Sequence, residues 1–580
     1  GSAWLRRDPL SEVAVAALIR AELASGASAA AHRHYQAFKA QLAVDIGVAP
    51  GPLVEAAIRG SATLPVSPEP AAAAPPTALV REAGEIVLAV LPFDNLSPDP
   101  ELAWLCDGVA EEIQRMVARG SDIKVVARSS SFQFRGQDKD VAVIAAALGA
   151  SHVLDGTVRR SGDRVRINVE LVECASLNTQ WSDRFEGSLD DVFALQDTIA
   201  ERVASTLKVA LAPDTASVTL DPRAYETFLR ARSILAEGDP QFDDSAKRAI
   251  PLLEQVVAAA PGHAPAWELL AGSRVAVLRH GHDDLPFEQA RDGVLEAARK
   301  ALAIDSRRSG AWLALATLEP WGAYAEREAL LSKALEASPR DPAVLTEMSS
   351  FCWNVGRFRD ALQHAEQACE LNPLMPAARL HAAQMRAYVG DYEASVRMLE
   401  GLHAMWPGNA GILMALLNWS VSLGFTAAYH RSVGDIAGFD GWQARDLNAV
   451  RLYAEAVLSD DPAIKLARVE SYAGVLKRGG TLPLNLVIAV ATIGYPELAL
   501  ELAEQASYDH VFDPAGPGHS AYYPGTALGP WSTLVLSPRF VGLCDRLGLC
   551  RYWLKSGNWP DCVAWAPYDF KAEVRRVVAG

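Results

Sequence analysis

Residues 342–375 read PAVLTEMSSFCWNVGRFRDALQHAEQACELNPLM, and residues 376–409 read PAARLHAAQMRAYVGDYEASVRMLEGLHAMWPGN. The two stretches have the same length of 34 residues, and a third copy begins at residue 410. Glycine recurs at one place in this period, at Gly356, Gly390 and Gly424. Glycine suits a tight turn between helices, and proline ends a helix. The pattern therefore predicts units of helix, turn and second helix.

Other positions keep the same register. Pro342, Pro376 and Ala410 open the units, and an aromatic residue follows the glycine at Phe358 and Tyr392. Small residues in the second helix allow the paired helices to approach closely. This 34-residue layout resembles the tetratricopeptide (TPR) family, which implies an all-α solenoid. The alternative is a plain helical bundle with coincidental spacing.

We assign residues 213–440 to the repeat array. Before the strict units, the W-x2-L pattern of the TPR family occurs at Trp267 and again at Trp312. Between them, His280, His282 and Asp283 have the chemistry of metal ligands, although a loop of this composition is more often simply solvated.

The composition excludes several classes of protein. The 580 residues are too many for one core, and a net charge of −16 disfavours nucleic-acid binding by this chain itself. No apolar run is long enough for a membrane span, and the seven cysteines form no CxxC pair. These features predict a multidomain cytoplasmic protein without a zinc site or a disulfide framework.

The sequence of residues 3–60 predicts a helical segment, with a helix start at Asp8 and Pro9 and a helix-breaking run, DIGVAP, at 45–50. The segment resembles the end of the bacterial transcriptional activator domain (BTAD) of SARP-type regulators. That resemblance implies a winged-helix DNA-binding domain ahead of it, and we expect this chain to lack that head. Residues 61–84 are rich in proline and alanine and are predicted to be a linker.

The sequence of residues 85–212 predicts a small α/β (α+β) domain. An apolar run at 86–91 indicates a buried strand, and alternation over 164–173 indicates a hairpin strand with one solvated face. The runs LPFDNLS at 91–97, DGVAEEI at 107–113 and LGASHVLDGTVRR at 148–160 resemble the TolB-like domain of bacterial TPR regulators and some adenylate cyclases.

Five acidic residues of this domain could suggest a metal site, namely Asp94, Asp99, Asp107, Glu111 and Glu112. We favour helix capping and turn formation as their role, because Asp and Asn ahead of a helix accept hydrogen bonds from its free N–H groups. The prediction is no metal and no cofactor.

Residues 441–580 are expected to form further helices and an aromatic cap. The end of this region carries four tryptophans at positions 531, 553, 559 and 565. Because a stacked array exposes an apolar face at its last unit, these side chains suit a cap. An aromatic ligand pocket is the alternative.

The chain has no sequence motif of a known catalytic centre. We find no GxSxG elbow, no phosphate-binding GxxxxGK[ST] loop and no HExxH. The sequence therefore predicts that the protein is not an enzyme.

TPR proteins bind ligands on the first helices of their units. Carried onto this register, the residues that face the groove are Glu268, Thr317, Thr346, Ser350, Trp353, Asn354, Gln384, Tyr388, Met414 and Asn418. The set is polar and aromatic with few charges. It predicts a mostly neutral ligand, or an element of the same chain that plugs the groove.

The function expected from these modules is that of a sensor and effector in a cytoplasmic transcriptional regulator. A protein, peptide or small-molecule effector would bind the TPR groove, and DNA would be contacted only through the missing head. A homodimer is possible in such regulators, although no coiled-coil heptad shows how it would form. The alternative is the regulatory or scaffold portion of a signalling enzyme such as an adenylate cyclase.

Overall fold

The computed structural model contains two compact units, Gly1–Pro76 and Thr77–Gly580. The residues that it describes are 34–35, 38–39, 86–97, 103–120, 123–136, 139–161, 164–188, 192–207, 220–237, 244–279, 286–479, 484–508 and 524–579.

In the first unit the described residues are helical. Tyr35 and Phe38 are buried, whereas His34 and Lys39 are exposed. Positions three apart lie on one face of a helix, so Tyr35 and Phe38 mark its apolar side. The remaining predictions for 3–84, including the linker, lie outside the described residues.

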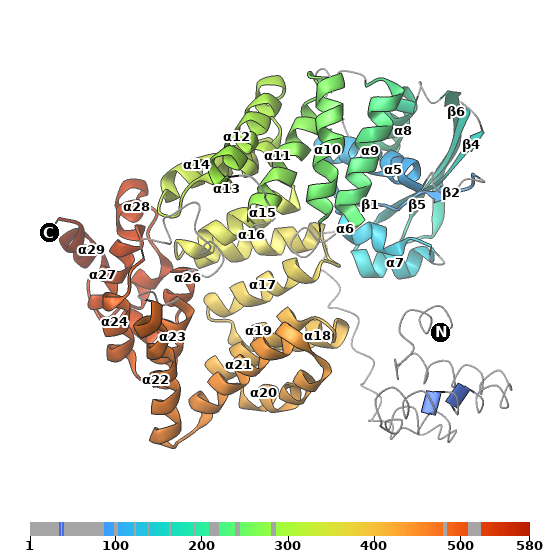
Figure 1. The fold of residues 1–580 in the computed structure, drawn as a ribbon. Coiled ribbons are helices and arrows are strands. Elements are labelled where there is room, and N and C mark those ends of the chain that lie inside the picture. The colour runs from blue at the N-terminus through green and yellow to red at the C-terminus, as the bar shows by residue number, and fades with distance from the viewer. Residues whose placement is uncertain are drawn as a thin grey trace. The chain divides into compact units, whose positions relative to one another are not determined.

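The second unit begins with a mixed sheet, whose order is β3-β1-β4-β5-β6, with β2 paired to β4 (Figure 1). The strands are β1 (Val87–Val90), β2 (Asp94–Asn95), β3 (Lys124–Val125), β4 (His152–Ser161), β5 (Arg164–Glu173) and β6 (Asn178–Ser188). The β1–β3, β1–β4 and β2–β4 pairs are parallel, and β4–β5–β6 is antiparallel.

Helices cover both faces of this sheet. On one face α5 (Ala103–Gly120) and α8 (Val192–Thr206) share a core with the apolar side of β5. On the other face α7 (Val141–Leu148) packs on β1 and β4 beside the short α6 (Arg128–Ser131) and the 3-10 turn η2 (Phe132–Phe134). We call residues 86–207 the sheet module.

The alternation predicted for β5 is confirmed, because its apolar residues are buried and its polar residues between Arg164 and Glu170 are exposed. The strand β6 is absent from the sequence-based prediction. Its sequence NTQWSDRFEGS is largely polar, and most of its residues are exposed at the edge of the sheet, so it lacks the apolar pattern of a buried strand.

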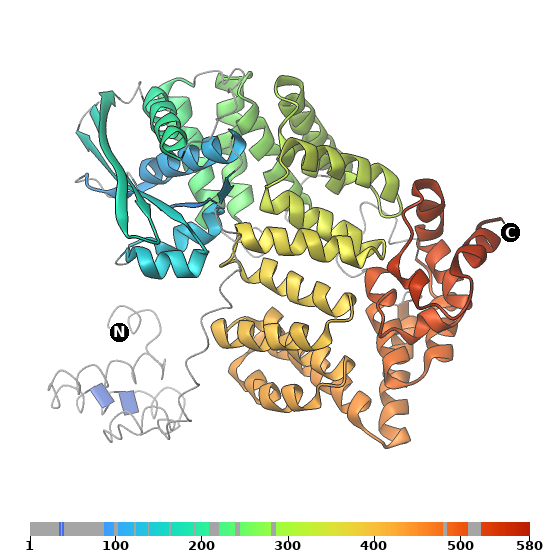
Figure 2. The same cartoon turned by 180° about the vertical axis from the view of Figure 1, so that it is seen from behind.

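Helix pairs follow the sheet module, as the green and yellow ribbons of Figures 1 and 2 show. The pairs are α9 (Pro222–Glu237) with α10 (Ser245–Ala259), α11 (Ala264–Arg279) with α12 (Phe287–Ile304), α13 (Ser309–Leu318) with α14 (Tyr324–Ala337), α15 (Pro342–Asn354) with α16 (Phe358–Leu371), α17 (Pro376–Tyr388) with α18 (Tyr392–Met405), and α19 (Ala410–Ser422) with α20 (Thr426–Ser432). The loop at 280–283 lies outside the described residues.

The predicted helix boundaries have clear local causes. Asp341 caps α15 by accepting a hydrogen bond from the backbone N–H of Ala343 at 2.9 Å. Gly356, Gly390 and Gly424 have φ values of +83°, +90° and +82°, in the left-handed region that glycine tolerates. The repeated glycine therefore makes the turn within each unit, as its spacing predicts.

Among the contacts that tie the sheet module to the repeats, two sets lie far apart in the chain. Arg232 of α9 forms ion pairs with Glu111 and Glu112 of α5. Far along the chain, the carbonyl of Leu371 at the end of α16 accepts from the N–H of Ala127 at 2.6 Å. Ser130 supports this second joint, because its hydroxyl donates to Asn372 at 2.6 Å and accepts from the N–H of Leu374 at 2.9 Å.

The C-terminal helices share one core with the later repeats. They are η4 (Val433–Gly438), α21 (Gly441–Leu458), α22 (Pro462–Gly479), α23 (Leu484–Ile493), α24 (Pro496–Gln505), α26 (Pro524–Ala527), η6 (Thr533–Leu536), α27 (Arg539–Arg546), α28 (Leu549–Ser556), η7 (Asp561–Ala564) and α29 (Phe570–Ala579). In Figure 1 α22, α24 and α27–α29 lie on the side opposite the strands β4–β6, whereas α21 lies beside α19 and α20.

Candidate functional site

All of the predicted groove residues lie on first helices of the helix pairs. We call the surface formed by α11, α13, α15, α17 and α19 the inner face. Glu268 lies on α11 and Thr317 on α13, and the other predicted residues lie on α15 (Thr346, Ser350, Trp353, Asn354), α17 (Gln384, Tyr388) and α19 (Met414, Asn418).

Several of these polar groups are engaged within the repeats. The carboxylate of Glu268 accepts from the N–H of Gly310 at 2.8 Å, which joins α11 to α13. The hydroxyls of Thr317 and Thr346 donate to carbonyl oxygens one turn earlier in their own helices, at 2.9 and 2.7 Å. These hydrogen bonds leave Glu268 and the two threonines with less capacity to select a ligand.

Trp353 and Tyr388 belong to an aromatic cluster on the inner face. Their ring centroids are 5.6 Å apart in an edge-to-face arrangement, and Tyr388 stacks on Phe358 at 4.8 Å. Trp419 approaches Tyr388 from α19 at 5.4 Å. Edge-to-face and offset contacts of this kind stabilise aromatic groups beyond their burial alone. The cluster is therefore built from three consecutive helix pairs.

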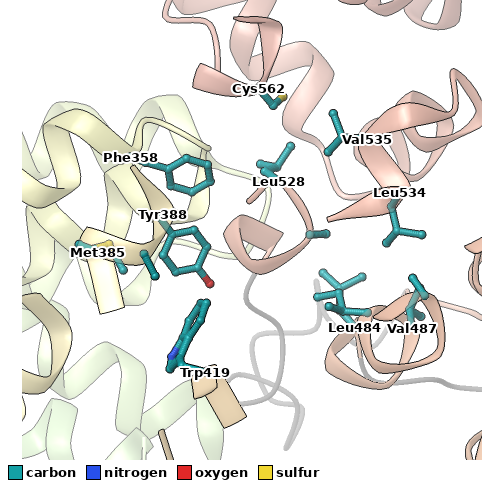
Figure 3. Packing of buried hydrophobic residues seen from close by; sticks show 14 of the residues in the cluster. Phe358, Met385, Tyr388, Trp419, Leu484, Val487, Leu528, Leu534, Val535 and Cys562 are labelled. Atoms are coloured by element: carbon teal, nitrogen blue, oxygen red, sulfur yellow. The ribbon is translucent and has the colours of Figure 1, made fainter. Parts of the chain in front are cut away.

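A segment from the C-terminal region covers the aromatic cluster. We call residues 524–531 the groove segment. Trp531 places its ring 4.5 Å from that of Tyr388 and 4.6 Å from that of Trp419. Leu528 is fully buried, and Figure 3 shows it between Phe358 and Tyr388 of the repeats and Leu534 and Val535 of the C-terminal region.

The groove segment fits without space for a larger residue at Gly525. A Cβ atom there would overlap the carbonyl oxygen of Trp353 and lie 2.8 Å from its carbonyl carbon. Burial raises the pKa of Tyr388 far above its usual range, and its hydroxyl is hydrogen-bonded to Thr526 of the segment. The phenol is therefore neutral and satisfied inside the protein, which is typical of a packed core.

Other C-terminal residues contact the turn between α15 and α16. The indole N–H of Trp553 donates to the carbonyl of Val355 at 3.0 Å, and the N–H of Asp561 donates to the carbonyl of Gly356 at 2.8 Å. The carboxylate of Asp561 accepts from the N–H of Arg359 at 3.1 Å. The turn after α15 is thus capped by the C-terminal region, so this part of the inner face binds an element of its own chain.

The predicted groove is therefore divided. Asn354 and Tyr388 are buried, while Asn418 is exposed and the other predicted residues are partly exposed. Whether the exposed part binds a ligand stays a prediction. An intramolecular element, which was the predicted alternative to a ligand, is present at the aromatic part of the inner face.

Gly356 and Gly390 provide a matched pair for testing this packing. Both need a left-handed backbone, so alanine at either position costs about 1 kcal/mol of strain. At Gly356 a Cβ would also lie 2.7 Å from that of Pro560 and 2.9 Å from Leu528, whereas nothing lies within 4 Å at Gly390. We expect Gly356→Ala to lower the free energy of unfolding by about 1–3 kcal/mol more than Gly390→Ala, as measured by urea denaturation. Equal losses would contradict the contact between the C-terminal region and the turn.

His381 lies beside the aromatic cluster and gives the inner face a pH dependence. Its ring is 6.3 Å from that of Trp353, and its Nε2 is 2.8 Å from the hydroxyl of Ser349. Burial lowers the pKa of His381 to about 4. The imidazole is therefore neutral in the folded protein at physiological pH.

This shift predicts a loss of stability in acid. Between the unfolded pKa of about 6.5 and the folded pKa, the unfolded chain binds the proton and the folded chain does not. Stability from His381 is thus present above about pH 6.5 and falls towards about pH 4. We expect His381→Gln to reduce the change in unfolding free energy between about pH 7 and pH 5 by about 2 kcal/mol. Parallel pH profiles for both proteins would exclude the effect; His263 has a similar pKa shift and leaves a residual slope in both.

The acidic residues of the sheet module are engaged with arginines. Asp107 pairs with Arg135, and Glu111 pairs with Arg128 at 3.3 Å and also with Arg232. Asp107 and Glu111 therefore do not cap helices as we expected but form a partly buried ion-pair network; Asp99 lies outside the described residues. Within the described ranges no three His, Cys, Asp or Glu side chains are grouped so that they could hold a metal ion.

A cavity of about 570 Å³ lies elsewhere, between the α13–α14 turn and α27–α28. Its lining carries both signs of charge, and the Lys555–Glu326 ion pair at 2.9 Å lies within that lining. Arg546 donates to the carbonyl oxygens of Ala503 and Glu504 at 2.8 and 2.9 Å. Lys555, Glu326 and Arg546 are therefore already partnered within the protein.

The sequence did not predict that Trp419 and Thr526 contact Tyr388, or that Gly525 packs against Trp353. The run around Tyr522–Gly525 and Trp531 suggests a cap, or alternatively an aromatic ligand pocket, when the sequence is read alone. The available signal was the coincidence of a polar and aromatic inner face with an aromatic C-terminal region. That coincidence does not specify which residues meet.

Comparison with known proteins gives a family match for the N-terminal segment. Residues 1–59 match the family "Bacterial transcriptional activator domain" (BTAD). A protein of Rhizobium meliloti (strain 1021) named "Putative adenylate cyclase 3" is 33% identical over 184 residues, which cover 31% of this chain and 31% of that protein. The chain therefore spans about a third of the length of this relative.

Similar solved structures include yeast Tom70, with 13% identity and a TM-score of 0.29 over 54% of this chain and 70% of that chain. A human IFIT1 dimer with PPP-AAAA has 13% identity and a TM-score of 0.29 over 68% of this chain and 84% of that chain. None of the described helices has both the length and the hydropathy needed to cross a membrane.

Proposed function

We propose that this chain is the sensing and effector part of a transcriptional regulator. The observation that carries the proposal is the BTAD match at residues 1–59. A stack of helix pairs and a small sheet module follow this segment in the same chain. The chain would act by binding and not by catalysis, in the cytoplasm, and DNA contact would come from a separate head domain.

The inner face supports a role in sensing, because its aromatic part already binds a segment of the protein. Trp531 and Leu528 of the groove segment are held by contacts that an effector could compete for, and Asn418 on the same face is exposed. An effector that prefers the inner face without the segment would shift the population towards the open state. The few charges on this face favour a mostly neutral effector.

A reporter assay tests the proposed function. The chain is joined to a heterologous DNA-binding domain whose operator precedes a reporter gene in a bacterial host. We expect transcription to rise with the whole chain and to fall to background when residues 1–59 are deleted. The DNA-binding domain alone is the control. Equal transcription from all three proteins would contradict an activator role.

The second candidate is a regulatory portion of an adenylate cyclase, which is favoured by the partial match to the Rhizobium protein. Purified chain with ATP should form no cyclic AMP under our proposal, and the residues encoded upstream of Ala3 should specify a winged helix with a basic recognition helix. A cyclase domain in that position would support the second candidate. The TolB-like resemblance of the sheet module is compatible with both.

A further inference from the structure

The strand β6 forms one edge of the sheet and has no strand beyond it among the described residues. It is 11 residues long, and seven of its residues are exposed. Its position at the margin of the unit, away from the C-terminal helices, can be followed in Figures 1 and 2. An edge strand of this length presents a row of backbone N–H and C=O groups that can pair with another strand.

We propose that β6 is a dimer interface, which pairs antiparallel with β6 of a second copy so that the two sheets become continuous. Proteins often place charges on an edge strand to prevent indiscriminate pairing. The charged residues of β6 favour one pairing register of the two strands and oppose the registers on either side of it.

The register follows from the pleat and the two-fold axis. Residues directly opposite each other in an antiparallel pair point to the same face of the sheet. In a two-fold symmetric pair of β6 strands, the axis perpendicular to the sheet must therefore pass between the two copies of one residue. An axis at Phe185 sets Arg184 of each copy opposite Glu186 of the other. An axis at Arg184 would place two arginines opposite each other, and an axis at Glu186 would place two glutamates opposite each other. Like charges directly opposite are destabilising, and opposite charges are favourable.

The side chains at the proposed interface are suitably placed. Arg184 is 62% exposed, and its Nε lies 3.4 Å from the carboxylate of Glu186, so both groups lie on the same face of the sheet. On the other face Phe185 and Trp181 are only partly buried, with ring centroids 6.1 Å apart. An axis at Phe185 brings its two copies together and extends this apolar strip across the interface.

Glu186 also pairs with Arg166 at 2.8 Å, from the neighbouring strand β5. This cross-strand pair holds the carboxylate on the exposed face, where a second copy would meet it. The proposed interface depends on neither the effector nor the promoter, and it supplies a means of association that no heptad in the sequence provides.

Charge reversal tests the proposal on the full chain by sedimentation equilibrium. We expect the native protein to dimerise and its dimer to weaken as salt is raised. Arg184→Glu sets two glutamates against two glutamates, and Glu186→Arg sets arginines against arginines. Each variant alone should dimerise at least about tenfold more weakly.

An equimolar mixture of the two variants is the decisive sample, because the mixed pair again sets glutamates opposite arginines. The mixture should form a heterodimer at concentrations at which each variant is monomeric. Arg397→Glu, on the exposed surface of α18, is the control and should leave the mass unchanged. A native protein that stays monomeric, a dimer unaffected by either reversal, or a mixture that does not associate would each overturn the proposal.

Discussion

Replacing Gly525 with alanine is expected to expel the groove segment from the inner face. The added Cβ would overlap the carbonyl oxygen of Trp353, which belongs to the backbone of α15 and cannot turn away. Overpacking against rigid backbone costs about 1–3 kcal/mol, so the cheapest response is for α26 to leave its place. Tyr388 and Trp419 would then lose their contact with Trp531 and become exposed.

Tryptophan fluorescence and limited proteolysis measure this change. We expect a red-shifted emission and faster cleavage near residues 524–531 in the Gly525→Ala protein. Gly542→Ala is the matched control, since Gly542 lies in α27 with nothing within 4 Å of the point that an added Cβ would occupy, and alanine should stabilise that helix slightly. If both variants behave like the native protein, the groove segment is not packed against α15.

Replacing Arg232 with methionine is expected to destabilise the joint between the sheet module and the repeats by about 1.5–3 kcal/mol. The Arg232 side chain is 11% exposed and pairs with Glu111 and Glu112, which are 23% and 18% exposed. Removing the cation leaves Glu111 with Arg128 and Glu112 with Arg115 as remaining partners, and takes away the ion pairs that join α9 to α5. Urea denaturation with probes on both parts measures the loss.

Two further variants separate charge from packing in this experiment. Arg232→Lys keeps the positive charge without the planar fork of donors, so it should lose less stability than Arg232→Met. Arg397→Ala removes an exposed pair with Glu393 and should change stability by less than about 0.5 kcal/mol. A loss in Arg232→Met no larger than that of Arg397→Ala would show that the joint does not depend on this ion pair.

The repeats could be predicted from the sequence because their determinants are local. The spacing from Pro342 to Gly356 and from Pro376 to Gly390 specifies each turn within its own unit. The same was true of β5, where apolar and polar residues alternate. The edge strand β6 could not be recognised, because exposed residues on both sides leave little alternation in its sequence.

The candidate site was predictable only in part, for a related reason. The repeat register identifies the helices that face inwards, and it placed Trp353 and Tyr388 on them. The partners of these rings come from Gly525 to Trp531, far along the chain, and no periodic pattern connects the two stretches. The arginine partners of Asp107 and Glu111 were missed because they come from separate segments, at Arg128 and Arg135 of the sheet module and at Arg232 of α9.

The hydrogen bonds between residues 127–130 and residues 371–374 have a mechanical consequence. In a stack of helix pairs each pair contacts only its neighbours, so the stack can lengthen and shorten elastically. Here the sheet module precedes α9 and is also hydrogen-bonded to the end of α16. The helix pairs between these two points therefore cannot move apart unless these hydrogen bonds break. Relative motion of the helix pairs is thereby left to α17 and the helices beyond it, where the groove segment joins Tyr388 and Trp419 to α15.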